Sequence, residues 1–404
     1  MPAPRSWIVL LAATVLIQVS ANFMTQAVWV LAPELTQSAG VAPERIGDLA
    51  ALVSLGSCSF FVFGGILLRR YGSLRAIQVG ILVTVASVGL LLAGTWPLMM
   101  LANLLMGLGY GPSPPAGSEI LARSVPPRQK ALAFSIRQAG GPLGAMIAGA
   151  VLPSIALALG WRWAMAFSGL VGVACIIMLQ PLREAVDATR QRDVAVTIRS
   201  LFSLANILAP VRSMRLSPSL PSLTVAAVAL AFVHGILASF MVTYMTTEIG
   251  LPFTVAGITY SALQMGGLCG RILVGWISDR IGSILATLKV LAVLTTVMTL
   301  AIATIAPGWP VPVILMLIVV TGLSATSWNG IHPAEVARLA PERAVGDTAA
   351  GSVFFTFLAY SLGPLAFSLA VAALGSYSLA FSGTAFLGLV ALWGLIIADR
   401  RARG

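Results

Sequence analysis

The sequence is poor in charged residues, cysteine and nucleotide-binding motifs, and each shortage excludes a class of protein. Only 9% of the 404 residues are charged, whereas soluble domains average about 25%. The chain is therefore not an ordinary soluble enzyme. Its three cysteines, Cys58, Cys175 and Cys269, all lie in apolar segments, which favours small packing residues over a disulfide or a metal site. No Gly-Lys-Ser/Thr phosphate loop is present, so ATP is not the expected driver.

Long apolar runs dominate what is there. Hydrophobic residues make up 58% of the chain, and the mean hydropathy is +0.96. The runs repeatedly exceed the ~18 residues that a helix needs to cross a bilayer, and they do not show the short alternating segments of a membrane barrel. The first run, at 7–32, is too long for a signal-peptide core, so it is interpreted as a first membrane span. The sequence predicts an all-α membrane protein.

Turn signals such as Gly72-Ser73, Pro252 and Pro307-Gly308 divide the apolar sequence into segments. They predict about twelve transmembrane helices, with ends accurate to a few residues. The predicted ranges are 7–32, 46–68, 74–94, 97–122, 130–157, 161–181, 221–247, 254–277, 284–306, 310–337, 347–372 and 375–398.

The net charge of +11 is distributed as a topology signal rather than as a nucleic-acid surface. With the N-terminus inside, one side of the membrane holds almost all basic residues. They are Arg5, Arg69, Arg70, Arg75, Arg123, Arg128, Lys130, the long loop, Arg280, Lys289, Arg338, Arg343, Arg400, Arg401 and Arg403. The other side holds only Arg45 and Arg162. Both termini are therefore predicted to be cytoplasmic, in the inner membrane of a bacterium.

Two sequence matches indicate that the chain is a duplication. Residues 65–73 (GILLRRYGS) align with 275–283 (GWISDRIGS), and 123–128 (RSVPPR) align with 338–343 (RLAPER). Both pairs are offset by about 210 to 215 residues and follow equivalent predicted helices, an arrangement associated with transport between two halves. The expected domains are a six-helix bundle at 1–181, a cytoplasmic linker at 182–220 and a second six-helix bundle at 221–404.

The predicted linker is the only long polar stretch of the chain. It is either an amphipathic helix on the membrane surface or a solvated tether between the halves. Its charged residues are Arg183, Arg190, Arg192, Arg199, Arg212, Arg215, Glu184, Asp187 and Asp193.

In the repeated loops at 65–73 and 275–283, the sequence resembles the major facilitator superfamily. The family signature, Gly-x-x-x-Asp-Arg-x-Gly after helix 2 and again after helix 8, is matched in the second copy by Gly275, Asp279, Arg280 and Gly282. The first copy departs, because Arg69 stands where the acid is expected. Residues 140–144 (GGPLG) partly match a Gly-Pro motif of helix 5. The resemblance implies twelve helices in two bundles and alternating access, and it says little about substrate.

A finer resemblance concerns residues 270–280, which are similar to helix 8 of monocarboxylate transporters and of the oxalate/formate exchanger. It implies that Arg271 engages a substrate carboxylate. The exchanger's lysine in helix 11 has no counterpart here, which counts against dicarboxylate exchange.

Two arginines lie inside predicted spans, where a charge needs a partner, a wet cavity or a role. Arg271 lies eight residues before Asp279, hence ~12 Å from that end of its helix, and Gln264 shares its face. Arg137 lies ~10 Å into helix 5. Each arginine is either a substrate contact or a structural group that snorkels or binds backbone carbonyls.

Other polar residues are candidates for binding or coupling. Gln18, Asn22 and Gln26 form one stripe on helix 1, which must face a pathway or another helix rather than lipid. Further substrate candidates are Tyr110, Tyr244, Trp328 and Asn329. His234 and His332 are either hydrogen-bonded structural groups or proton carriers.

Acidic residues are confined to the predicted ends of spans. Glu119 with Arg123, and Glu335 with Arg338, are expected to form inner-gate or capping ion pairs, and Asp279 with Arg280 belongs to the loop signature. Two arginines with no central acid favour an anionic substrate.

The sequence thus predicts a monomeric secondary transporter of a small organic anion, a monocarboxylate being favoured. Its expected partners are the bilayer, the solute and either protons or a counter-anion. No enzyme activity, metal, cofactor or nucleic acid is expected. The alternatives are efflux of a neutral or amphiphilic compound and a non-transporting receptor.

Overall fold

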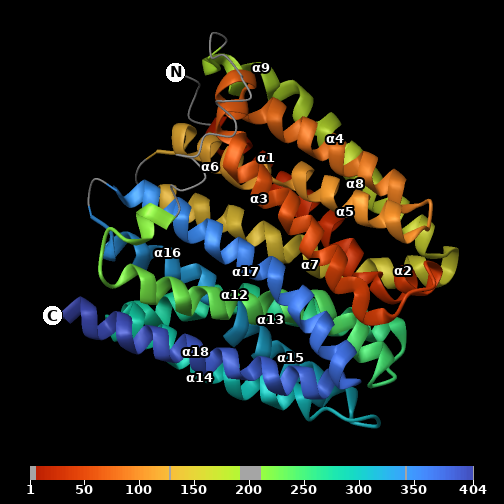
Figure 1. The fold of residues 1–404 in the computed structure, drawn as a ribbon. Helices are drawn as coiled ribbons and strands as arrows, with labels where there is room; N and C mark the ends of the chain where they lie inside the picture. The colour runs from red at the N-terminus through yellow and green to blue at the C-terminus, as the bar shows by residue number, and fades with distance from the viewer. Residues whose placement is uncertain (1–5, 127–128, 192–210, 342–343, 404) are drawn as a thin grey trace. The chain divides into compact units, whose positions relative to one another are not determined.

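The computed structural model describes residues 6–126, 129–191, 211–341 and 344–403, and all regular structure in these ranges is helical (Figure 1). By the density of its contacts the chain divides into two compact units. Unit 1 comprises residues 1–41 and 52–203, and unit 2 comprises residues 42–51 and 204–404. The three-part division at 181 and 220 stays a prediction, since much of the linker lies outside the described residues.

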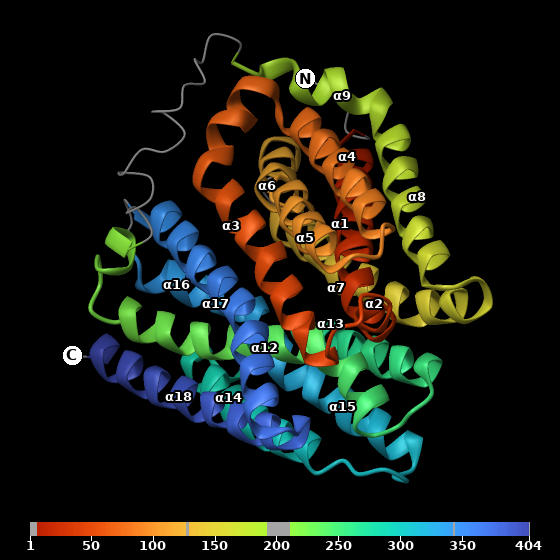
Figure 2. The same cartoon turned by 45° about the vertical axis from the view of Figure 1, so that its right-hand side comes forward.

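Unit 1 is built from long apolar helices, and it ends in short turns. Its helices are α1 Ser6–Val30, α2 Ala32–Ser38, most of α3 Ile46–Tyr71, α4 Ser73–Leu91, α5 Trp96–Tyr110, α6 Ser113–Ser124, α7 Lys130–Leu159 and α8 Trp161–Leu179, followed by the short turns η3 Gln180–Leu182, α9 Arg183–Val186 and η4 Asp187–Thr189. In unit 1, α1 packs along α7, and α4 packs against α5 and α8 (Figure 2).

Unit 2 repeats this packing. It contains η1 Pro43–Arg45, the start of α3, α12 Leu220–Thr247, α13 Phe253–Ile281, α14 Ile284–Ala303, α15 Val311–Thr326, α16 Trp328–Leu339, α17 Val345–Leu374 and α18 Tyr377–Arg403. Here α12 packs along α17, and α14 packs against α15 and α18. These are the pairs that the duplication makes equivalent to the α1, α4 and α7 pairs of unit 1.

Glycines at repeated positions show the duplication in atomic detail. A Cβ on Gly107 of α5 would lie 1.7 Å from the Val53 carbonyl oxygen of α3, and one on Gly322 of α15 would lie 2.1 Å from the Leu263 carbonyl oxygen of α13. The two glycines are 215 residues apart, as are the loop segments 123–128 and 338–343. Glycine is thus required where each pair of backbones touches, since a Cβ would overlap a carbonyl.

Two predicted helices contain an interruption: 97–122 is wrong as one continuous helix, whereas 310–337 is confirmed as one span that is interrupted within it. The predicted helix 97–122 is divided into α5 and α6 at Gly111-Pro112, and 310–337 into α15 and α16 at Ser327. Prolines in the first interruption lack the N–H that continues a helix. At the second, Thr326 and Ser327 donate their hydroxyls to the carbonyls of Gly322 and Leu323, which competes with the backbone ladder.

Among the described residues, nine helical segments are long and apolar enough to span a membrane, or ten if the bent pair Pro43–Phe61 and Gly64–Tyr71 is one span. The segment Val311–Leu339 counts as a single span despite the interruption at Ser327. The chain is thus an all-helical membrane protein. Twelve spans and cytoplasmic termini stay predictions.

Candidate substrate-binding and gating residues

Arg137 is enclosed within unit 1, with only 2% of its surface exposed. Its Nη2 donates to the carbonyl oxygens of Ser113 (2.8 Å) and Pro114 (3.1 Å), which open α6. The same atom donates to Gln18 Oε1 (3.3 Å), and Nη1 donates to Ser118 Oγ (3.2 Å). None of these acceptors is a carboxylate. The guanidinium therefore binds the first turn of α6, just after the interruption, to α7 and α1.

The polar stripe of α1 faces these same elements. Gln18 and Asn22 are buried, and Gln18 Nε2 donates to the Tyr110 hydroxyl at 3.4 Å. Asn22 Nδ2 donates to the Gln18 carbonyl at 2.9 Å. Cβ atoms on Gly140 and Gly141 of α7 would meet Gln18 and Asn22 within 4 Å. The stripe thus joins α1 to α5 and α7 inside unit 1, while Gln26 is partly exposed.

Arg271 occupies a different setting in unit 2. Arg271 is a partly exposed residue of α13. Its side chain packs on the first turn of α16, where a Cβ on Gly330 would lie 3.6 Å from Arg271 Cβ. The helical ladder of α16 begins at this glycine, whose N–H donates to the Ser327 carbonyl at 2.9 Å. Arg271 is also within electrostatic range of His234, and Gln264 lies buried two turns earlier on α13.

The two histidines have aromatic neighbours within unit 2. The ring of His234 meets that of Tyr360 edge-on, with centroids 5.2 Å apart. His332 is 5% exposed, and its ring lies 5.6 Å from that of Trp328. Within the described part of the chain, His332 Nε2 and Trp328 Nε1 have no hydrogen-bond partner. The participation of His234 and His332 in proton coupling stays a prediction.

Two further substrate candidates differ in access. Tyr244 is fully buried, and its hydroxyl donates to the Ile302 carbonyl at 3.0 Å; its contact with substrate stays a prediction. Asn329 is exposed next to Gly330, at the start of α16.

Both expected acid–arginine pairs are present. Glu119 pairs with Arg123 and accepts a hydrogen bond from the Ser73 hydroxyl at 2.6 Å. Glu335, 1% exposed, pairs with Arg338 at 2.6 Å. Their role in gating stays a prediction. A third pair, Lys289 with Asp399 at 2.5 Å, joins α14 to α18 and was not foreseen.

Two carboxylates cap the starts of helices, and neither cap was predicted from the sequence. Asp187 accepts from the N–H groups of Leu74 (2.9 Å) and Arg75 (3.0 Å) at the start of α4. Glu248 accepts from the N–H groups of Tyr377 (2.6 Å) and Ser378 (3.1 Å) at the start of α18. Burial by itself raises the pKa of Glu248, but its hydrogen bonds outweigh burial and lower that pKa. Capping acids are favoured at these helix ends.

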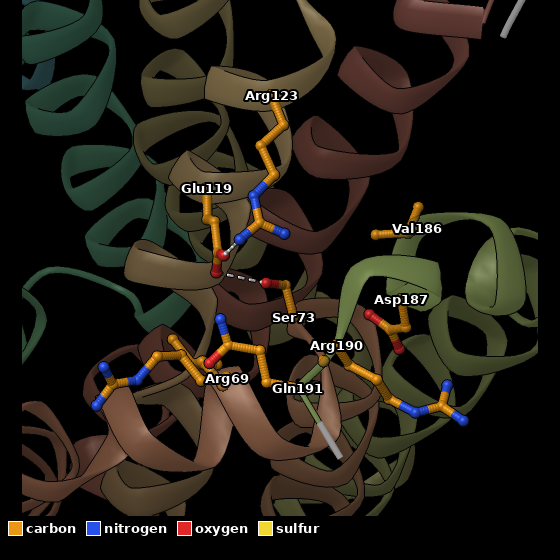
Figure 3. A pocket seen from close by; sticks show the side chains of 10 residues that line it. Arg69, Ser73, Glu119, Arg123, Val186, Asp187, Arg190 and Gln191 are labelled. Carbon is orange, nitrogen blue, oxygen red and sulfur yellow. Dashed lines mark hydrogen bonds and ion pairs between the residues drawn. The ribbon is translucent and has the colours of Figure 1, made fainter. Parts of the chain in front are cut away.

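Asp187 takes part in a small pocket at one end of unit 1 (Figure 3). Figure 3 shows Ser73, Glu119 and Arg123 gathered on one side and Asp187 on the segment after α9. Gly72, with φ of +97°, is needed there both for its backbone conformation and because a Cβ would meet Asp187 Cγ at 2.4 Å. The sequence held one signal for Asp187: it lies 212 residues before Asp399, a separation between the offsets of the two loop matches, 210 and 215.

The second signature loop precedes α14. Asp279 and Arg280 are exposed, and the Arg280 guanidinium lies 4.4 Å from the centroid of the Trp276 ring. Ser283 caps α14 by accepting from the Ala286 N–H at 3.2 Å.

Several predicted residues lie outside the described part of the chain: Arg5, Arg128, Arg192, Asp193, Arg199 and Arg343. Within the described part, no group of three His, Cys, Asp or Glu residues could hold a metal ion, and the three cysteines are free.

Long apolar helices, a repeated pattern of helix pairs and an interrupted helix with an arginine at its break in each unit are features of a duplicated membrane carrier. The sequence matches the Major Facilitator Superfamily over residues 14–364. The chain therefore belongs to this superfamily of transporters.

Relatives and solved structures agree with this assignment. An "Uncharacterized MFS-type transporter" of Mycobacterium tuberculosis is 25% identical over 65% of this chain and 56% of its own length. The Hexuronate transporter of Bacillus subtilis is 22% identical over 63% of this chain and 60% of its own length. The chain thus spans little more than half the length of these relatives. A peptide transporter in complex with sulfate has the same fold, with a TM-score of 0.79 at 15% identity over 98% of this chain and 95% of its own.

Proposed function

We propose that the chain is a secondary transporter of a small organic anion, with a monocarboxylate as the favoured substrate, and that it works by alternating access. The proposal includes twelve spans with both termini in the cytoplasm of a bacterium. The observation that carries it is the position of Arg271 beside the first turn of α16.

A partly exposed arginine next to the start of a helix is suited to an anion. The first N–H groups of a helix lack intrahelical acceptors and carry partial positive charge. Membrane carriers use such interrupted helices to bind anionic groups of their substrates. A guanidinium adds paired, planar donors that fit a carboxylate in two parallel bonds. Arg271, Asn329 and the start of α16 together supply both elements.

The charge of Arg137 in unit 1 also supports an anionic substrate. Arg137 has no carboxylate partner among the described residues, and it is bound by carbonyl, amide and hydroxyl oxygens. The dipoles of these groups therefore stabilise the positive charge of Arg137, but no negative charge neutralises it. An uncancelled positive charge raises the local concentration of anions.

The names of relatives support the substrate class. They include the Hexuronate transporter, "Probable anion transporter 6, chloroplastic" of Arabidopsis thaliana, 25% identical over 39% of this chain, and the 3-(3-hydroxy-phenyl)propionate transporter of Escherichia coli, 24% identical over 66% of this chain and 63% of its own length. Hexuronates and hydroxyphenylpropionate are small carboxylates.

A thermal-shift screen of the purified protein tests the proposal. Small monocarboxylates, dicarboxylates, amines and neutral sugars are added at a series of concentrations. A bound ligand raises the free energy of unfolding by an amount set by its concentration relative to Kd, about 2.7 kcal/mol at a hundredfold excess over Kd. We expect monocarboxylates to raise Tm. Stabilisation by amines or neutral compounds and by no acid would contradict the anion proposal and favour efflux of a neutral or amphiphilic compound.

A further inference from the structure

At the pocket end of unit 1, arginines outnumber the acids that are free to pair with them. Arg69 and Arg190 line the same pocket, because the Gln191 N–H donates to the Arg69 carbonyl at 2.9 Å and holds the two segments together. Arg70 is next along the chain. Arg183 lies in α9, which packs on α4. We call Arg69, Arg70, Arg183 and Arg190 the arginine cluster.

The two acids that line the pocket, Asp187 and Glu119, are already engaged. Asp187 has no exposed side-chain surface, accepts two backbone hydrogen bonds and lies 4.0 Å from Arg75 Nε. Glu119 is paired with Arg123 and bound by Ser73. In the described chain, no ion pair is formed by the four arginines of the cluster. Figure 3 shows the Arg69 and Arg190 side chains pointing away from one another on either side of Gln191, so they do not chelate one common group.

The cluster lies next to apolar surface. Gln78 Nε2 donates to Gln180 Oε1 at 3.0 Å, which fastens α4 to the end of α8 at this level. One turn after Arg75, Val79 of α4 is 60% exposed, and Ile177 near the end of α8 is 66% exposed. In a membrane protein such side chains face acyl chains. An occupant of this surface therefore has apolar chains along α4 and α8 and a negative group at the level of the arginines.

We propose that the arginine cluster binds the headgroup of an anionic phospholipid, with its phosphate at Arg69 or Arg190. The family signature places an acid at position 69, and the exchange to arginine turns this loop from one that attracts basic groups into one that attracts phosphate. Basic residues at the membrane boundary recognise anionic lipids through charge, and arginine presents paired donors that match phosphate. A soluble acidic protein is the less suitable partner, because it would leave the exposed apolar side chains beside the cluster unused.

Native mass spectrometry of the detergent-purified full chain tests this. Individual lipid adducts are titrated with phosphatidylglycerol and with phosphatidylcholine of the same acyl chains. We expect tighter binding of phosphatidylglycerol, and a loss of about fivefold in that preference for each arginine removed. The Arg69→Gln/Arg190→Gln double variant should thus lose most of it. The matched control is Arg162→Gln, which removes an exposed arginine at the opposite end of α8, bound to the Leu92 carbonyl.

The outcomes separate the explanations. Equal binding of both lipids by the parent, an unchanged preference in the double variant, or an equal loss in Arg162→Gln would overturn the proposal. Displacement of phosphatidylglycerol by millimolar inorganic phosphate would identify a free-anion site and overturn the lipid assignment. The lipid-free Tm of each variant is measured as a folding control, and Arg69→Lys/Arg190→Lys, which keeps both charges, should retain most of the preference.

Discussion

In each unit an arginine packs against a glycine of the helix that follows the interruption, and the two arginines differ in almost every other respect. Gly117 lies in α6 and Gly330 in α16, the helices that follow the two interruptions. A Cβ on Gly117 would lie 2.5 Å from Arg137 Nη2, and one on Gly330 would lie 3.6 Å from Arg271 Cβ. Arg137 reaches its glycine with its charged end, whereas Arg271 reaches its glycine with its apolar stem.

In our proposal, this difference separates a structural role for Arg137 from a binding role for Arg271. Arg137 comes from α7, is 2% exposed and holds α6 through its carbonyls. Arg271 comes from α13, is partly exposed, and covers its glycine with Cβ and Cγ. Each of the two helices α6 and α16 has a glycine against an arginine, and the arginine comes from α7 in unit 1 and from α13 in unit 2. The same local shape therefore serves to fasten the helix in unit 1 and, in our proposal, to bind an anion in unit 2.

The largest expected effect is on stability, in Arg137→Ala. Loss of the guanidinium removes charge-assisted hydrogen bonds and leaves Gln18 and Ser118 without this donor. A cost of about 2–4 kcal/mol in the free energy of unfolding is expected, measured as a fall in Tm. Arg271→Ala should cost less than about 1 kcal/mol. Equal destabilisation by the two variants would show that Arg271 is also structural and remove the contrast.

Next is an effect on binding, in Arg271→Lys. Lysine keeps the charge but not the paired donors, so the affinity for a stabilising carboxylate should fall about tenfold to a hundredfold. Arg137→Lys should leave affinity closer to the parent value, provided that it folds. The measurement is a ligand titration followed by transport in proteoliposomes, with Arg162→Lys as the control. If Arg271→Lys binds as tightly as the parent, the anion proposal loses its main support.

The smallest effect distinguishes the two glycines. Gly117→Ala forces a methyl group onto the Arg137 guanidinium and should cost about 1–3 kcal/mol by overpacking. Gly330→Ala meets only ordinary van der Waals contact with Arg271 and should be neutral or gain up to about 1 kcal/mol from helix propensity. Tm values of the two variants in one detergent decide this. A larger loss in Gly330→Ala than in Gly117→Ala would contradict the assigned packing.

The class of protein and most of the helices could be predicted from the sequence. Apolar length and glycine or proline punctuation located ten of the twelve predicted segments to within a few residues, for example 130–157 against Lys130–Leu159. The duplication was also visible, because loops must turn at equivalent places in each half. Hydropathy alone did not reveal the two interruptions, since the residues on both sides of Ser327 are apolar or weakly polar.

The hydrogen-bond partners of the polar side chains were decided by tertiary structure. The sequence limited Arg137 to two roles, and the carbonyls of Ser113 and Pro114 favour the structural one. Asp187 was assigned to a polar linker, yet it caps α4, more than a hundred residues away in sequence. Hydrophobic burial acts on whole segments and leaves a periodic trace in the chain. A hydrogen bond depends on two groups meeting within about 3 Å, and that meeting is set by helix packing rather than by local sequence.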